Sequence, residues 1–189
     1  MLTYNSDRSF VAFVQCNTPE FEGYLDCGEL AMKGGEPMRR AADWLTVTSF
    51  KDKEPHRFWF RCFEDGEGNR YFDIQSWSRR TGRDRNPSMR HTSLSHNGYV
   101  GLYDTPNAQE TLWQVMVFDG EQSVHLPEPL ALGKIESVEI ITYMGAPMCA
   151  CKREEVGHVW HAYVADAGGP LLTLTLDVID LGEELLDDH

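Results

Sequence analysis

The sequence predicts an all-β protein, and three observations lead to this prediction. Short stretches rich in aromatic and β-branched residues recur along the chain. Turn residues, mainly Gly, Pro, Asn and Asp, separate these stretches at short intervals. Only residues 37–45 show the spacing of apolar residues that is typical of a helix. Together they predict one domain of about ten or more short strands, arranged as a β-sandwich or a barrel.

The first part of the chain contains the one candidate helix. Residues 9–16 are apolar on one face and partly so on the other, which suits a strand buried on both sides. A second short strand is expected at 24–27. Pro37 follows two glycines and could occupy the first position of a short helix near residues 37–45. The alternative is a loop that leads into the β-rich stretch 46–50.

The central part of the chain predicts paired strands. Strands at about 57–63 and 70–77 flank a connection rich in hairpin residues. Asn97-Gly98 is the strongest short hairpin signal, before a strand at 99–103. In the strand at 112–118, alternation places Trp113 and Leu112 on opposite faces and predicts that Trp113 is buried.

Four further strands are expected in the last third of the chain, and Gly and Pro separate most of them. They span about 135–144, 148–152, 157–165 and 171–179. The predicted organisation is therefore a single all-β domain over residues 1–180, followed by an acidic C-terminal tail over 181–189.

A weak threefold repeat offers a third arrangement. A strand, a turn and a closing strand recur three times, with closing strands at 44–47, 113–115 and 172–176. The stretch from Asn97 to Val115 resembles a β-trefoil repeat of the ricin-type or fascin-like kind. The Gln-x-Trp signature of the ricin type is absent, because Trp113-Gln114 has the reverse order. A β-trefoil-like fold therefore stays open beside the sandwich and the barrel.

Composition limits the classes of function. The 189 residues include 30 acidic and 17 basic ones, a formal net charge of −13, which argues against general nucleic-acid binding. The excess of acid fits a solvated surface or a basic protein partner. No apolar run approaches the roughly 20 residues of a membrane span. The odd number of cysteines and a start unlike a signal peptide favour free thiols and a cytoplasmic location.

The strongest functional signal is an arginine-rich segment, residues 79–91, between two aromatic-rich blocks. It carries five arginines and one acid in an otherwise acidic chain. Guanidinium groups bind carboxylates and phosphates, and nearby aromatic rings add stacking or cation–π contacts. The alternative is that these arginines pair with the protein's own acids. The predicted ligand-binding residues are Trp77, Arg79, Arg80, Arg83, Arg85, Arg90, His91, Tyr99 and Tyr103.

A second candidate site combines Cys149 and Cys151 with His158 and His161. Zinc accepts such ligands, but the two histidines would point to opposite faces of a strand. We therefore expect no metal or other cofactor, and a domain that folds without metal. No pattern of nucleophile, base or phosphate-binding loop is recognisable.

Three functional hypotheses follow. The first is a non-catalytic module that binds a glycan or an anionic group through the arginine-rich segment and its neighbouring aromatics. The second is an acidic inhibitor or immunity-type protein that covers a basic protein partner. The third is a metal-dependent enzyme that uses the Cys149, Cys151, His158 and His161 set. A concave pocket floored by Trp or Tyr, with Arg79 to Arg90 at its rim, favours the first, and a flat or convex acidic patch with aromatic and Leu anchors favours the second.

Overall fold

The computed structural model describes residues 1–51, 55–77, 90–104 and 112–182, which contain thirteen strands and no helix. The all-β prediction is confirmed. The strands are β1 (Thr3–Cys16), β2 (Gly23–Lys33), β3 (Glu36–Thr48), β4 (Arg57–Glu64), β5 (Arg70–Trp77), β6 (His91–Leu94), β7 (Val100–Tyr103), β8 (Leu112–Phe118), β9 (Ser123–His125), β10 (Gly133–Thr142), β11 (Cys149–Val156), β12 (Val159–Ala165) and β13 (Leu174–Leu181). Among the described residues there is no helix that could cross a membrane.

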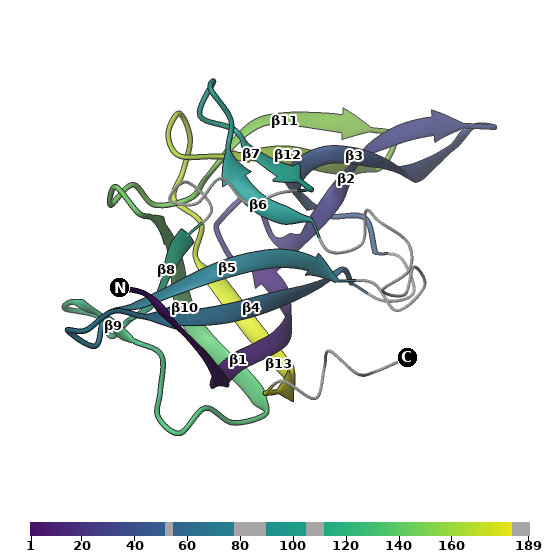
Figure 1. The fold of residues 1–189 in the computed structure, drawn as a ribbon. Helices are drawn as coiled ribbons and strands as arrows, with labels where there is room; N and C mark the ends of the chain where they lie inside the picture. Colours follow the sequence, from purple (N-terminus) through teal and green to yellow (C-terminus); the bar gives the residue numbers. More distant parts are fainter. Residues whose placement is uncertain (52–54, 78–89, 105–111, 183–189) are drawn as a thin grey trace.

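Six of these strands form a closed ring. Antiparallel pairing runs from β5 through β4, β1, β13 and β10 to β8, and the pairing of β8 with β5 closes the ring. The closing contact joins Phe72 to Trp113 and Asp73 to Leu112. In Figure 1 these strands lie together below the layer formed by β2, β3, β6, β7, β11 and β12. The short strand β9 extends the edge at β8.

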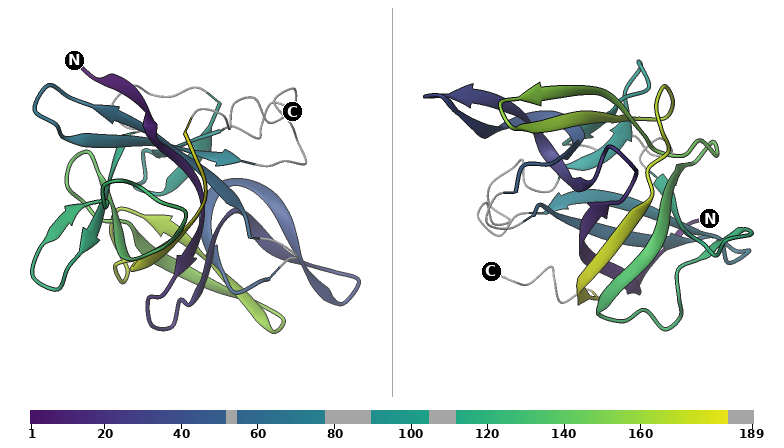
Figure 2. Two further views of the ribbon diagram at one scale, coloured as in Figure 1. Left: turned by 90° about the horizontal axis from the view of Figure 1, so that it is seen from below. Right: turned by 180° about the vertical axis from the view of Figure 1, so that it is seen from behind.

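The upper layer consists of three hairpins, β2–β3, β6–β7 and β11–β12, which we call the hairpin triplet. Each hairpin follows a ring strand in the chain, namely β1, β5 or β10, and leads back to the next ring strand. The hairpins also pair with one another, through His161 and Thr48, Trp44 and Gly101, and Tyr99 and Ala165. Figure 2 shows β2–β3 and β11–β12 projecting from the ring.

A six-stranded ring with three hairpins at one end is the arrangement of a β-trefoil, a barrel-like fold. Of the arrangements that the sequence left open, the strand pairing therefore matches the trefoil alternative. The weak repeat in the sequence corresponds to three units of ring strand, hairpin and ring strand, which begin at β1, β5 and β10.

The main core fills the ring and the space beneath the hairpin triplet. Alternate residues of each ring strand point inward because side chains of a strand alternate between its two faces. Trp113 is 1% exposed, and its indole N–H donates to the carbonyl of Thr92 at 3.3 Å. The prediction that Trp113 is buried is confirmed. Leu112, on the other face, lies outside the main core cluster. Besides Trp113, the inward side chains from the ring are Phe10, Ala12, Val14, Cys16, Phe58, Phe60, Cys62, Phe72, Ile74, Val115, Val138, Ile140, Leu174, Leu176 and Val178.

The predicted short helix near residues 37–45 is wrong, because this segment belongs to β3. Gly34 and Gly35 have φ angles of 60° and 87° and form the two-residue connection between β2 and β3. Positive φ at both positions is the backbone conformation of a tight type I′ hairpin turn. Pairing of β3 with β2 from Lys33↔Glu36 onward then satisfies the backbone groups that a helix would have satisfied internally.

Candidate functional site

Five of the nine predicted ligand-binding residues are among the described ones. Arg79, Arg80, Arg83 and Arg85 fall in the range 78–89, outside the described residues. The described residues are Trp77, Arg90, His91, Tyr99 and Tyr103, and the structure does not bring all of them together. They occupy three places, on the outer face of the ring, between the ring and β3, and on the hairpin triplet.

Trp77 and His91 lie against the outer face of the ring. Trp77 is 8% exposed and contacts Trp59 edge to face, with 6.2 Å between ring centroids. The Nδ1 atom of His91 lies 2.8 Å from Oδ1 of Asp73, and Gln75 donates to the other carboxylate oxygen at 2.7 Å. Asp73 and Gln75 are both buried. Trp77 thus packs with Val11 and Trp59 in a second, smaller cluster outside the ring, whereas His91 pairs with the buried Asp73.

Arg90 is paired internally. Its Nη1 donates to Oδ1 of Asp43 at 2.6 Å, its Nη2 donates to the carbonyl of Leu102, and its Nε lies 3.2 Å from Oδ1 of Asp104. Its side chain is 17% exposed, whereas those of Asp43 and Asp104 are largely exposed. For this one arginine, contacts agree with the alternative in which the segment pairs with the protein's own acids.

Tyr99 and Tyr103 lie on the outer side of the hairpin triplet, facing away from the core residues Val100 and Leu102. Two further aromatics join them. Trp44 of β3 contacts Tyr99 with 6.1 Å between ring centroids, and Tyr163 of β12 lies at the same distance from Tyr99 on another side. All three hairpins therefore contribute rings to one surface. We call Trp44, Tyr99, Tyr103 and Tyr163 the aromatic face.

Gly101 is needed at the centre of the aromatic face. It pairs directly with Trp44, and a Cβ atom at this position would lie 2.9 Å from a ring carbon of Tyr103. Any larger residue would displace that ring. Tyr103 is 38% exposed and Trp44, Tyr99 and Tyr163 are half-buried. The rings are thus held in place but still reach the surface.

Charged groups surround the aromatic face. The ammonium group of Lys152 lies 4.9 Å from the ring centroid of Tyr99, a cation–π distance. The hydroxyl of Tyr163 donates to Glu29 at 2.9 Å, and Arg40 donates to the other oxygen of the same carboxylate at 2.5 Å. The hydrogen bond from Arg40 lowers the pKa of Glu29, while burial, and then this carboxylate, raise the pKa of Tyr163. Glu29 is therefore ionised and Tyr163 is protonated at neutral pH.

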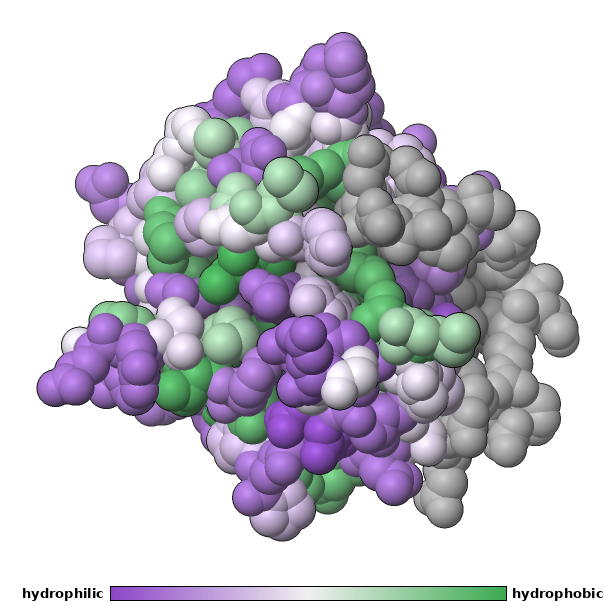
Figure 3. All heavy atoms as spheres, turned by 60° about the vertical axis from the view of Figure 1, so that its left-hand side comes forward, coloured by the Kyte–Doolittle hydropathy of each residue, from purple (hydrophilic) through white to green (hydrophobic). Residues whose placement is uncertain are grey.

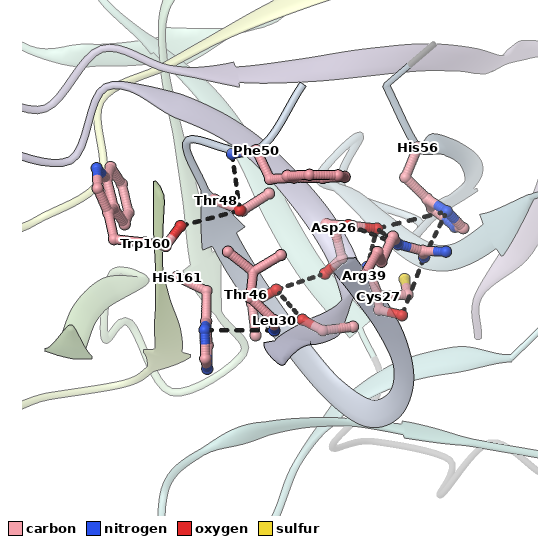
Figure 4. Close-up of polar contacts among 11 residues, drawn as sticks. Asp26, Cys27, Leu30, Arg39, Thr46, Thr48, Phe50, His56, Trp160 and His161 are labelled. Carbon is pink, nitrogen blue, oxygen red and sulfur yellow. Dashed lines mark hydrogen bonds and ion pairs between the residues drawn. The ribbon is translucent and has the colours of Figure 1, made fainter. Parts of the chain in front are cut away.

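A partly buried polar set lies beneath β2–β3, and Figure 4 shows it around Asp26, Arg39 and His56. The Nε atom of Arg39 donates to both carboxylate oxygens of Asp26, at 2.9 and 2.6 Å, and Nη2 donates to the carbonyl of Cys27 at 3.1 Å. The Nδ1 atom of His56 lies 3.5 Å from Nη2 of Arg39. The set joins β2, β3 and the segment before β4, so it stabilises the packing of the hairpin against the ring.

The same set is poorly suited to acid–base or nucleophilic chemistry. Burial lowers the pKa of His56 to about 4, so its ring is neutral at pH 7. Burial also raises the pKa of the Cys27 thiol well above its usual value, and a protonated thiol is a poor nucleophile. Arg39 already pairs with the carboxylate of Asp26.

The Cys and His residues of the second candidate site make separate contacts. His158 is exposed in the turn between β11 and β12, whereas His161 is 1% exposed and accepts the N–H of Leu30 at 3.4 Å (Figure 4). Cys149 and Cys151 each donate to a nearby backbone carbonyl. Across the described ranges no group of three or more His, Cys, Asp or Glu side chains is placed to hold a metal ion.

A pocket of about 420 Å³ opens at the end of the ring away from the hairpin triplet. β1, β5 and β10 all begin near this end and run towards the triplet. Charged and apolar residues far apart in the sequence line the pocket, and no local pattern pointed to it. They are Asp7, Arg8, Arg70, Phe72, Leu126, Pro127, Glu128, Pro129 and Leu130.

The face of the molecule seen in Figure 3 carries small groups of hydrophobic residues among hydrophilic ones. Over the described residues, this face therefore shows no broad apolar surface of the kind that obligate protein interfaces use. Comparison with known proteins adds no functional information, because no family model, curated protein or solved structure matches the chain.

Sequence reasoning found two of the four aromatic-face residues and missed Trp44 and Tyr163. The helix assigned to residues 37–45 hid Trp44, whose neighbour Leu45 faces the core. The signal that could have found both is the threefold repeat, because it makes the strands that carry Trp44, Tyr99 and Tyr163 members of three equivalent hairpins.

Proposed function

We propose that the protein is a non-catalytic ligand-binding module and that the aromatic face binds a glycan. The observation that carries this proposal is the meeting of three half-buried aromatic rings, one from each hairpin, with the exposed Tyr103 beside the neighbouring Gly101. A sugar ring has an apolar face of C–H groups that stacks on aromatic rings, and the ring's hydroxyl groups stay at the rim. Aromatic side chains with a polar end are suited to such a partly wet contact.

The polar neighbours of the aromatic face supply partners for sugar hydroxyls. Glu29 accepts hydrogen bonds, while Arg40 and Lys152 donate them. Arg40 and Lys152 are exposed, so both can reach a ligand that lies on the rings. The aromatic rings would contribute contact area and the charged groups would select the orientation of the hydroxyls.

An anionic glycan would involve the arginine-rich segment as well. The one arginine of the predicted set that is described, Arg90, is already paired with two carboxylates, so the proposal rests first on the aromatic face. Arg83→Ala combined with Arg85→Ala separates the two ligand classes. A neutral glycan should bind this double variant as it binds the wild type. An anionic one should bind more weakly, by a factor that shrinks as salt is added.

A glycan array followed by calorimetry of the strongest hit tests the proposal. Tyr99→Ala and Trp44→Ala should each weaken binding at least about tenfold, which corresponds to roughly 1.4 kcal/mol. Tyr71→Ala is the matched control, because Tyr71 is a partly exposed aromatic at the start of β5 whose ring contacts Tyr143 and not the aromatic face. Its affinity should equal that of the wild type. The absence of any saturable glycan binding, or equal losses in Tyr71→Ala and Tyr99→Ala, would overturn the proposal.

A further inference from the structure

The pocket at the open end of the ring combines an apolar floor with a charged mouth. Phe72 and Leu126 are members of the main core cluster, and Leu130 packs against it, so the base of the pocket is continuous with the core. Arg8 and Arg70 stand at its side. A volume of about 420 Å³ lies within the usual range of small-molecule sites. The pocket thus has the form of a site for a small molecule with one apolar and one polar end.

Two carboxylates neutralise the two arginines. Glu128 pairs with Nη2 of Arg8 at 2.8 Å and also with Nη2 of Arg70. Glu64 pairs with Nη1 of Arg8 and lies 3.6 Å from Nε of Arg70. Glu64 is 23% exposed, and Asn5 donates to its other oxygen at 3.0 Å, which anchors it to β1. Glu128 is 45% exposed and has only the two arginines as charged partners among the described residues.

The pairing leaves Arg70 incompletely satisfied. Its Nε atom is buried and has no hydrogen-bond partner among the described residues, and its side chain is 14% exposed. Its Nη1 donates to the carbonyl of Leu126 at 3.5 Å, the limit of a hydrogen bond. A guanidinium group binds a carboxylate best when two parallel N–H groups contact both oxygens. Arg70 therefore retains capacity for a better-placed carboxylate.

From this geometry we infer that the pocket binds a small carboxylate with a flexible apolar chain, and that the Glu128 carboxylate occupies the ligand's position when the pocket is empty. The ligand carboxylate would contact Arg8 and Arg70, and its apolar chain would lie over Phe72, Leu126 and Leu130. Glu128, which is more exposed than Arg8, Arg70 and Glu64, would move into solvent. This site is separate from the aromatic face, so it goes beyond the proposed function.

Titration of the full chain with decanoate, by calorimetry and by NMR of the leucine methyl groups, tests the inference. Decanoate should bind saturably and shift the Leu126 and Leu130 methyl signals. Decanol, which has the same chain without the carboxylate, should bind at least tenfold more weakly. Glu128→Gln removes the internal competitor and should tighten decanoate binding several-fold. Glu67→Gln is the matched control, since it makes the same change in charge in the exposed β4–β5 turn and should leave the affinity unchanged.

Each contrary result has a definite meaning. The absence of saturable decanoate binding to the wild type, or methyl shifts elsewhere than at Leu126 and Leu130, would overturn the inference, even if Glu128→Gln did not fold. Equal affinity for decanol would contradict the inference, because it would show that the arginines do not bind the carboxylate of the ligand. Weaker decanoate binding by a folded Glu128→Gln would show that Glu128 supports the site rather than competes for it. Tyr99→Ala should not change decanoate binding, so this experiment and the glycan experiment can fail independently.

Discussion

The two sides of the hairpin triplet are built from the same strands but differ in what their side chains contact. On the inner side, Leu45 and Leu102 are 1% and 4% exposed and belong to the main core. Their immediate neighbours, Trp44 and Tyr103, point outward and remain partly exposed. Alternation along a strand therefore places on one side a surface that stabilises the fold. It places on the other side a surface whose large rings contribute little to stability. The proposed role in binding rests on this difference.

The largest expected effect is on the inner side. Trp113→Ala removes a side chain that is 1% exposed, together with its hydrogen bond to Thr92, and leaves a cavity in the core. We expect a loss of roughly 3–5 kcal/mol in the free energy of unfolding. Urea denaturation of the wild type and the variant measures it. A loss below about 1 kcal/mol would mean that the ring interior does not carry the stability that its burial implies.

The next effect is a dependence of stability on pH that arises from His56. Its pKa is about 4 in the folded protein and 6.5 as the ordinary value, so the unfolded chain binds the proton first as the pH falls. The stability that depends on the neutral His56 ring is fully present above about pH 6.5 and is lost as the pH falls from 6.5 to 4. The shift corresponds to about 3 kcal/mol as an upper estimate. The stability of His56→Phe, measured between pH 7 and 4, should fall less than that of the wild type. Equal slopes would contradict the burial of this ring in its neutral form.

A smaller effect is expected for Arg90, which lies between the two sides. Arg90→Gln removes ion pairs with the largely exposed Asp43 and Asp104 and a hydrogen bond to the carbonyl of Leu102. Exposed ion pairs contribute little, and a hydrogen bond contributes about 1 kcal/mol. We expect the free energy of unfolding to fall by roughly 1 kcal/mol. An unchanged value in thermal or urea unfolding would show that the internal pairing of Arg90 does not hold the β6–β7 hairpin.

The sequence predicted most of the fold because its strong local signals agree with the tertiary structure. Expected strands at 57–63, 70–77 and 112–118 correspond to β4, β5 and β8, and Asn97-Gly98 forms the connection between β6 and β7. The exception is β3. Its apolar spacing fitted a helix, but the Gly34-Gly35 turn and pairing with β2 decided the structure. Long-range pairing outweighed local spacing there.

Much of the candidate site was beyond sequence reasoning, because its residues meet only after the three hairpins pair. Trp44 and Tyr163 reach Tyr99 through contacts between β3, β7 and β12. The set of Asp26, Arg39 and His56 likewise joins three segments with no recognisable spacing. The arginine-rich segment was visible in the sequence because its residues are neighbours in the chain. Of its five arginines, the structure describes Arg90 alone.

The smallest expected change in stability is that of a substitution in the aromatic face. The same substitution tests the central claim that this face binds a glycan. Tyr99→Ala removes a half-buried ring outside the core. The most direct test measures two quantities on this variant, the free energy of unfolding and the affinity for the glycan that binds the wild type best. We expect a stability loss below about 1 kcal/mol, because the ring lies outside the core but contacts Trp44, Tyr163 and Lys152, and affinity at least about tenfold lower. Affinity equal to that of the wild type, or a loss of stability comparable to that of Trp113→Ala, would contradict the claim.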